Sequence, residues 1–178
     1  NEYETFIRSN QAIRIVEKIM KLSYKRHLDL VVFPRLPFGI PTTYEPVKEG
    51  VPCFFTQRLG VQPVRAEDIK DSFGLLNKWK FLVPKAPIAG QTDFTKPVAF
   101  YYEGNTRIAK PGTVCSESWL VAGAFDTELE AKSYKSYIFT KIVRFLLLQT
   151  VVSQNISKKN YCFIPDLEKY SEEYTDEK

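Results

Sequence analysis

The spacing of apolar residues predicts a helix near each end of the chain. Between residues 4 and 24, apolar side chains recur near helical spacing, with basic residues and Glu17 between them. A longer helix is expected from Thr127 to about Thr150. It starts at the segment Thr127-Glu128-Leu129-Glu130, which matches the S/T-x-x-E capping box.

The region between these helices predicts short strands joined by proline-rich loops. Residues 66–77 are ambiguous and allow one short helix, whereas 34–46 and 84–97 contain several prolines and indicate loops. The predicted strands are residues 30–33, 51–56, 78–83, a hairpin of 98–102 and 106–109 around Glu103-Gly104-Asn105, and 114–125 with a polar break at 116–118. This order predicts an α+β fold: an N-terminal helix, a mixed or antiparallel sheet, and a long C-terminal helix.

The length of 178 residues fits one domain. We expect residues 1–160 to form that domain and 161–178 to form an extended acidic tail, either disordered or truncated. Because the chain begins without methionine, we expect it to be a fragment of a longer protein. No run of about 18 apolar residues predicts a membrane span, and the polar, acidic first residues do not indicate a signal peptide. A cytoplasmic protein without a membrane partner is therefore expected.

Charge is distributed unevenly along the chain. Residues 161–178 hold six carboxylates and two lysines, a net charge of −4, so the other 160 residues, with 23 basic and 15 acidic groups, carry +8. A basic body suggests a polyanionic partner such as nucleic acid. The alternative is a solvated, lysine-rich surface.

Several classes of chemistry lack their usual motifs. The chain has no glycine-rich phosphate loop, no C-x-x-C pair among its three cysteines, and a single histidine, His27. A nuclease metal site using Asp166, Glu168 or Glu130 stays open as an alternative, since clustered carboxylates hold divalent cations. A protein-interaction domain that uses the amphipathic first helix is a further alternative.

Aromatic and basic residues alternate in several of the predicted strands and loops. Such residues can stack bases and pair with phosphates, although aromatics also pack cores while lysines stay solvated. The polar residues Ser116, Glu117 and Ser118 interrupt an apolar strand, and either line a recognition cleft or cap a bulge. The candidate DNA contacts are Arg58, Arg65, Lys80, Lys85, Tyr101, Tyr102, Arg107, Lys110, Ser116 and Ser118.

Segments between residues 79 and 177 resemble, in order, motifs of adenine-N6 DNA methyltransferases of type II restriction–modification systems. Residues 79–86, WKFLVPKA, resemble their K-V-L-I-P-K strand, and 114–125, VCSESWLVAGAF, resemble V-C-T-E-T-Y-L-V-I-G-x-F. Residues 140–146, TKIVRFL, resemble T-K-F-x-R-F-L. Residues 154–156, QNI, 163–167, FIPDL, and 174–177, YTDE, resemble T-Q-N/H-x, F-V-P-x-x-D and W-T-D-E. The first 78 residues match only loosely.

The resemblance implies a C-terminal target-recognition region, which binds double-stranded DNA and selects its sequence. The chain lacks both the Pro-Pro dipeptide of the family's catalytic motif and its F-x-G-x-G loop. It is therefore expected to be non-catalytic and to bind no cofactor. S-adenosylmethionine would belong to a catalytic domain elsewhere in a bacterial-type parent chain, which is a methyltransferase or a methyltransferase–restriction endonuclease fusion. The basic candidates would then contact phosphates or guanine.

Overall fold

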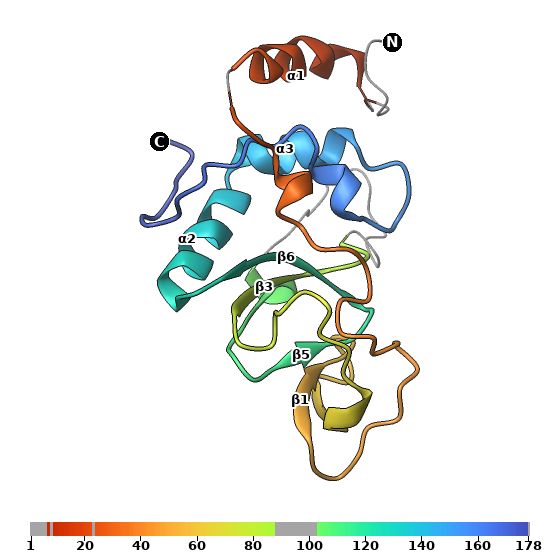
Figure 1. The fold of residues 1–178 in the computed structure, drawn as a ribbon. Helices are drawn as coiled ribbons and strands as arrows, with labels where there is room; N and C mark the ends of the chain where they lie inside the picture. The colour runs from red at the N-terminus through yellow and green to blue at the C-terminus, as the bar shows by residue number, and fades with distance from the viewer. Residues whose placement is uncertain (1–6, 8, 23, 88–102, 178) are drawn as a thin grey trace.

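The computed structural model describes residues 7, 9–22, 24–87 and 103–177, and confirms the α+β class. Figure 1 shows the layers: helices above a central sheet, with an outer sheet below it. The three-stranded central sheet has the order β4-β3-β6, and the outer sheet β2-β1-β5. The strands are β1 (Val51–Phe54), β2 (Val61–Val64), β3 (Trp79–Pro84), β4 (Arg107–Ala109), β5 (Val114–Cys115) and β6 (Trp119–Phe125).

The central sheet is buried on both faces. Strand β3 lies in its middle and pairs antiparallel with β4 and β6. Because successive side chains point to opposite faces, Phe81 and Val83 enter the hydrophobic cluster under the helices, whereas Leu82 enters the cluster of the outer sheet. The position of Gly123 in β6 also matters, since a Cβ there would lie 3.0 Å from the Tyr134 ring. The glycine lets Tyr134 of helix α2 (Glu128–Ile138) pack closely on the sheet.

The outer sheet covers the other face of the central sheet. Strand β1 pairs antiparallel with β2 and parallel with β5. The predicted proline-rich loop 34–46 completes this half of the molecule, because Phe38 and Ile40 are buried in the same cluster as Phe55 and Trp119. The Trp119 indole donates to the Phe55 carbonyl and so joins the two sheets.

The predicted long C-terminal helix is two helices, α2 (Glu128–Ile138) and α3 (Lys141–Gln149). The predicted capping box is confirmed at the start of α2. The Thr127 hydroxyl accepts from the Glu130 amide, and the Glu130 carboxylate accepts from the Thr127 amide. The break follows Ile138, and the Thr140 hydroxyl donates to the Tyr137 carbonyl, 2.8 Å away. Apolar spacing continues across this break, which explains the prediction of one helix.

Two other predictions need correction, namely the length of the first helix and the strand at residues 30–33. The first α-helix, α1, spans only Ile13–Met20 after a 3-10 turn at Asn10–Ala12. Residues 30–33 are not a strand; the chain forms a 3-10 turn at Leu28–Leu30, and Val32 packs under the helices.

The predicted strands 51–56, 78–83 and the interrupted 114–125 are confirmed with shifted bounds. Within 66–77 the only described helical turn is the 3-10 segment Ala66–Asp68. Other 3-10 turns lie at Glu103–Asn105 and Lys158–Tyr161. Residues 98–102 of the predicted hairpin lie outside the described residues.

The acidic tail is folded onto the helices rather than disordered. Tyr161, Ile164 and Tyr170 belong to the cluster under α2 and α3. The Ser133 hydroxyl of α2 donates to the Glu172 carbonyl at 2.5 Å. The tail thus packs through its apolar residues, while most of its carboxylates face solvent. None of the described helices has the length and hydropathy that crossing a bilayer would demand.

Candidate nucleic-acid interface

Polar residues from three parts of the chain meet at the end of the central sheet where β3 ends and β4 and β6 begin. Lys85 directly follows β3, and its amide donates to the Ser118 carbonyl at 3.0 Å. Arg107 opens β4, where it pairs with Leu82 of β3. We call the group Arg58, Lys85, Arg107, Glu117 and Ser118 the polar end of the central sheet. All five of these residues were named in the sequence analysis, four of them as candidate DNA contacts.

The turn between β1 and β2 joins the polar end through Gln57. The Gln57 amide donates to the Asn105 carbonyl at 3.2 Å, and its oxygen accepts from the Arg107 guanidinium at 2.8 Å. Arg58, the next residue, is exposed. No described residue forms an ion pair with it. Arg58 therefore directly follows the residue through which Arg107 is joined to the turn between β1 and β2.

The interruption at residues 116–118 is a rigid turn. Ser116 is fully buried, and its amide donates to the Phe54 carbonyl at 2.9 Å. The Ser116 hydroxyl accepts from the Ser118 amide at 3.4 Å, while the Ser118 hydroxyl lies 3.1 Å from that of Thr42. Ser116 therefore stabilises the turn instead of lining a cleft. Ser118 is partly exposed and remains a candidate contact.

Glu117 and Lys85 form the main ion pair of the polar end. The Lys85 Nζ lies 2.7 Å from the Glu117 Oε1, and the two side chains are 24% and 35% exposed. The hydrogen bond and charge of Lys85, followed by the charge of Arg35, lower the pKa of Glu117. The site thus carries one carboxylate among several cations, held in place by the turn.

Arg107 is held in one orientation by its neighbours. Its guanidinium donates to the carbonyls of Gly104 and Thr106, at 2.8 and 2.7 Å, in addition to Gln57. The guanidinium carbon lies 5.7 Å from the centre of the Trp119 ring, which is a cation–π distance. Arg107 is half-buried, so it presents a fixed positive charge at the surface.

The structure contradicts the assignment of Lys80 as a DNA contact. Its side chain is fully buried on the face of β3 that meets the outer sheet. The ammonium donates to the carbonyls of Lys78 and Leu75, at 2.6 and 3.0 Å, with longer contacts to Leu76 and Lys110. Burial lowers the pKa of Lys80 to about 8. The residue ties the turn before β3 to the end of β4 and cannot reach a phosphate.

The remaining basic candidates lie away from the polar end. Lys110 follows Ala109, which pairs with Lys80 at the start of β3, the other end of the central sheet. Arg65 follows Val64, which pairs with Val51 at the start of β1. Both side chains are exposed, and a guanidinium nitrogen of Arg65 lies 3.7 Å from a carboxylate oxygen of Asp68. The two predicted stacking residues, Tyr101 and Tyr102, lie outside the described residues.

The carboxylates proposed for a nuclease already have structural partners. Asp166 is buried and accepts from the Tyr170 hydroxyl at 2.8 Å, the Glu168 amide at 3.0 Å and the Arg26 guanidinium. Glu130 forms the capping box of α2. In the part of the chain that the structure describes, no group of three His, Cys, Asp or Glu residues could hold a metal ion.

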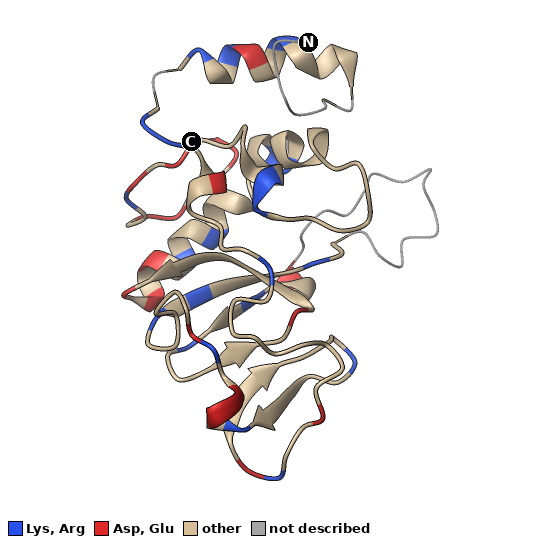
Figure 2. Cartoon of the chain, turned by 45° about the vertical axis from the view of Figure 1, so that its right-hand side comes forward, with Lys and Arg blue, Asp and Glu red and all other residues tan. Residues whose placement is uncertain are grey.

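Arg35, Thr42 and Gln57 were not identified from the sequence. They lie in loops without periodicity, and only the tertiary contacts of Glu117, Ser118 and Arg107 bring them to the site. Figure 2 shows basic and acidic residues interleaved along the part of the chain that the structure describes. No protein-family model, curated protein or solved structure matches this chain.

Proposed function

We propose that the chain is a non-catalytic DNA-binding domain that recognises a target sequence, and that its polar end contacts the duplex. One observation carries the proposal. Three separately encoded segments meet near the end of the central sheet: Arg107 donates to Gln57, the residue before the exposed Arg58, and Lys85 pairs with Glu117 beside the partly exposed Ser118. Arginine and lysine pair with phosphates or guanine, and a glutamate can accept from the amino group of cytosine.

The geometry supports this function in a second way. Most side chains of the polar end are held by hydrogen bonds before any ligand binds: Arg107 by three acceptors, Glu117 by Lys85, and Ser118 by the Thr42 hydroxyl. Fixed donors and acceptors lose little conformational freedom on binding, which favours discrimination between base pairs. Methyl transfer is not part of the proposal, because the chain lacks the family's catalytic and cofactor motifs.

The test is fluorescence anisotropy on a randomised duplex pool at two or more salt concentrations. Each neutralised phosphate should contribute a fall of about 0.9 in log K per tenfold rise in salt. The variant Arg58→Ala/Lys85→Ala should bind more weakly and show a smaller slope, by about 0.9 for each phosphate contact that is lost.

The chain offers a matched control. Arg65→Ala/Lys110→Ala removes the same two charges at exposed positions away from the polar end. The control should keep the wild-type slope. An equal loss in both double variants would indicate diffuse charge attraction, and the absence of salt-dependent binding would contradict the proposal.

A further inference from the structure

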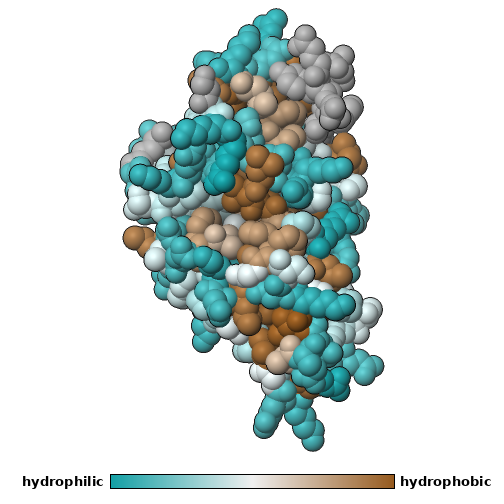
Figure 3. All heavy atoms as spheres, in the orientation of Figure 1, coloured by the Kyte–Doolittle hydropathy of each residue, from teal (hydrophilic) through white to brown (hydrophobic). Residues whose placement is uncertain are grey.

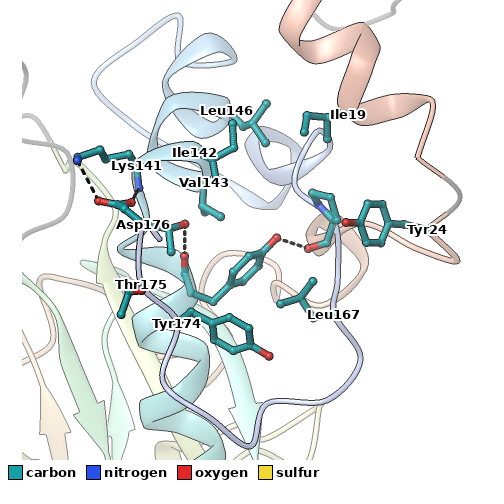
Figure 4. A pocket seen from close by; sticks show the side chains of 13 residues that line it. Ile19, Tyr24, Lys141, Ile142, Val143, Leu146, Leu167, Tyr174, Thr175 and Asp176 are labelled. Carbon is teal, nitrogen blue, oxygen red and sulfur yellow. Dashed lines mark hydrogen bonds and ion pairs between the residues drawn. The ribbon is translucent and has the colours of Figure 1, made fainter. Parts of the chain in front are cut away.

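A cavity of about 480 Å³ lies between α1, the first turns of α3 and the acidic tail. Figure 4 shows Ile19 and Tyr24 on one side of it and Ile142, Val143 and Leu146 on the other. In the space-filling view, apolar atoms gather below α1 and over α3 (Figure 3). The volume is in the range of pockets that bind drug-sized ligands. It therefore has room for a few large side chains.

Apolar residues extend beyond the cavity along α1. Ile15, Ile19 and Leu22 are spaced by four and three residues, so they follow one face of the helix and the turn after it. Ile19 lines the cavity, whereas Leu22 is 48% exposed and Ile15 nearly as much. Across the cavity, Ile142 of α3 is 43% exposed. Together these residues form a strip longer than the cavity.

Uncompensated positive charge borders this strip. A basic residue directly precedes each of the three strip residues of α1 and the turn after it. These basic residues are Arg14, Lys18 and Lys21, and all are exposed. None of them has an ion pair among the described residues, whereas the nearby Lys25 and Lys141 are paired with Glu168 and Asp176 of the tail. The only acidic residue of α1 is Glu17. The border along α1 thus has an excess of positive charge.

We propose that this groove binds an amphipathic helix of a partner chain, with apolar side chains inserted between α1 and α3 and acidic residues facing the basic row. Helices bind apolar grooves through anchors at i, i+3 or i+4, and i+7, which is the spacing of the strip on α1. Charge complementarity then selects an acidic partner and excludes a basic one. The proposal is independent of DNA binding at the polar end.

The probe is a fluorescein-labelled helical peptide of about 16 residues, with leucine on one face and glutamate elsewhere, a length at which isolated helices become populated. A second peptide carries lysine in place of glutamate, and a third alanine in place of leucine. Anisotropy with the full chain should show binding of the glutamate peptide at least about tenfold tighter than of either counterpart.

Matched variants test the location. Ile142→Glu should weaken binding of the glutamate peptide at least about tenfold, and Lys18→Glu should weaken it severalfold. Val152→Glu, at a 73% exposed position after α3, should bind like wild type. If Ile142→Glu loses the wild-type circular dichroism spectrum, Leu22→Glu replaces it, because that side chain is also exposed.

Three results would overturn the proposal. The first is equal affinity for the glutamate and lysine peptides. The second is peptide binding that Ile142→Glu and Val152→Glu affect equally. The third is a labelled DNA duplex whose affinity falls in Lys18→Glu while the glutamate peptide fails to bind, because the basic row would then contact nucleic acid.

Discussion

Replacing Lys80 with methionine should change how the stability of the protein varies with pH. Burial lowers the pKa of Lys80 from 10.5 to about 8 in the folded chain. Between these pH values the unfolded chain holds a proton that the folded chain has released, so the lysine raises the free energy of unfolding as pH rises. The buried charge lowers the free energy of unfolding by its full amount below pH 8, and this loss becomes smaller as pH rises above 8. Methionine keeps the apolar stem and removes the titration.

The structure sets the size of this effect. Each pKa unit corresponds to 1.36 kcal/mol, so the complete effect is about 3 kcal/mol. About 2–3 kcal/mol of it falls between pH 7 and pH 10. Over that interval, the free energy of unfolding of the wild type should therefore rise by about this amount relative to Lys80→Met.

Urea unfolding at several pH values, followed by tryptophan fluorescence, measures this difference. The comparison between variants is needed because burial also raises the pKa of Cys53 to about 12, and that of Cys115 further. Unfolded thiols ionise first, so both cysteines lower stability as pH rises above their ordinary value. This opposing contribution is common to both proteins and cancels. Lys110→Met, at an exposed lysine, controls for the loss of one charge.

Parallel stability curves for wild type and Lys80→Met from pH 7 to pH 10 would refute the reasoning, because they would mean that the ammonium is not desolvated. The same variant also tests the correction made above. If Lys80→Met reduced the salt dependence of DNA binding as strongly as Lys85→Ala does while unfolding like wild type, Lys80 would be a surface contact after all.

Two further predictions concern the tail and the thiols. Asp176 accepts from the Lys141 amide at 2.5 Å, and this hydrogen bond lowers the pKa of Asp176. The contribution of Asp176 to the free energy of unfolding is therefore present above the ordinary aspartate range and is lost as pH falls through the lowered pKa. Asp176→Ala should therefore lower the melting temperature by about 3 °C at pH 7 and by less in acid, whereas Glu177→Ala should leave it unchanged in calorimetry. At pH 8, dithiobis-nitrobenzoate should modify Cys162 at least about ten times faster than the two buried thiols; three equal rates would contradict the assigned burial.

Local signals in the sequence predicted the elements whose stabilising partners lie close in the chain. Both halves of the capping box lie within four residues, and the start of α2 was predicted correctly. The first turn of α3 is capped instead by Asp176, which is 35 residues away from the Lys141 amide that it accepts from. Apolar spacing carries no information about such a partner.

The errors at Lys80 and at residues 30–33 share a physical cause. The interleaving of basic and aromatic residues made Lys80 a candidate contact, but the outer sheet covers its side of β3, and Lys80 satisfies backbone carbonyls there. Residues 30–33 do not form a strand: Val32 packs under the helices, Phe33 packs against the outer-sheet cluster, and Leu30 is 68% exposed. The polar end was predicted residue by residue through Arg58, Lys85, Arg107 and Ser118. Their convergence depends on pairing between distant strands, which one sequence does not encode locally.

The contacts between the two ends of the chain determine when the helical half can be completed during synthesis. His27 forms a β-bridge with Pro165, Arg26 pairs with Asp166, and Asp176 caps α3. A ribosome delivers the chain from its N-terminus, and domains generally fold as units. The strands of both sheets, complete by Phe125, can assemble first. Until the tail has emerged, α3 lacks its acidic cap, and Arg26 and His27 lack their partners. The helical half therefore cannot reach its final packing before the tail has been made.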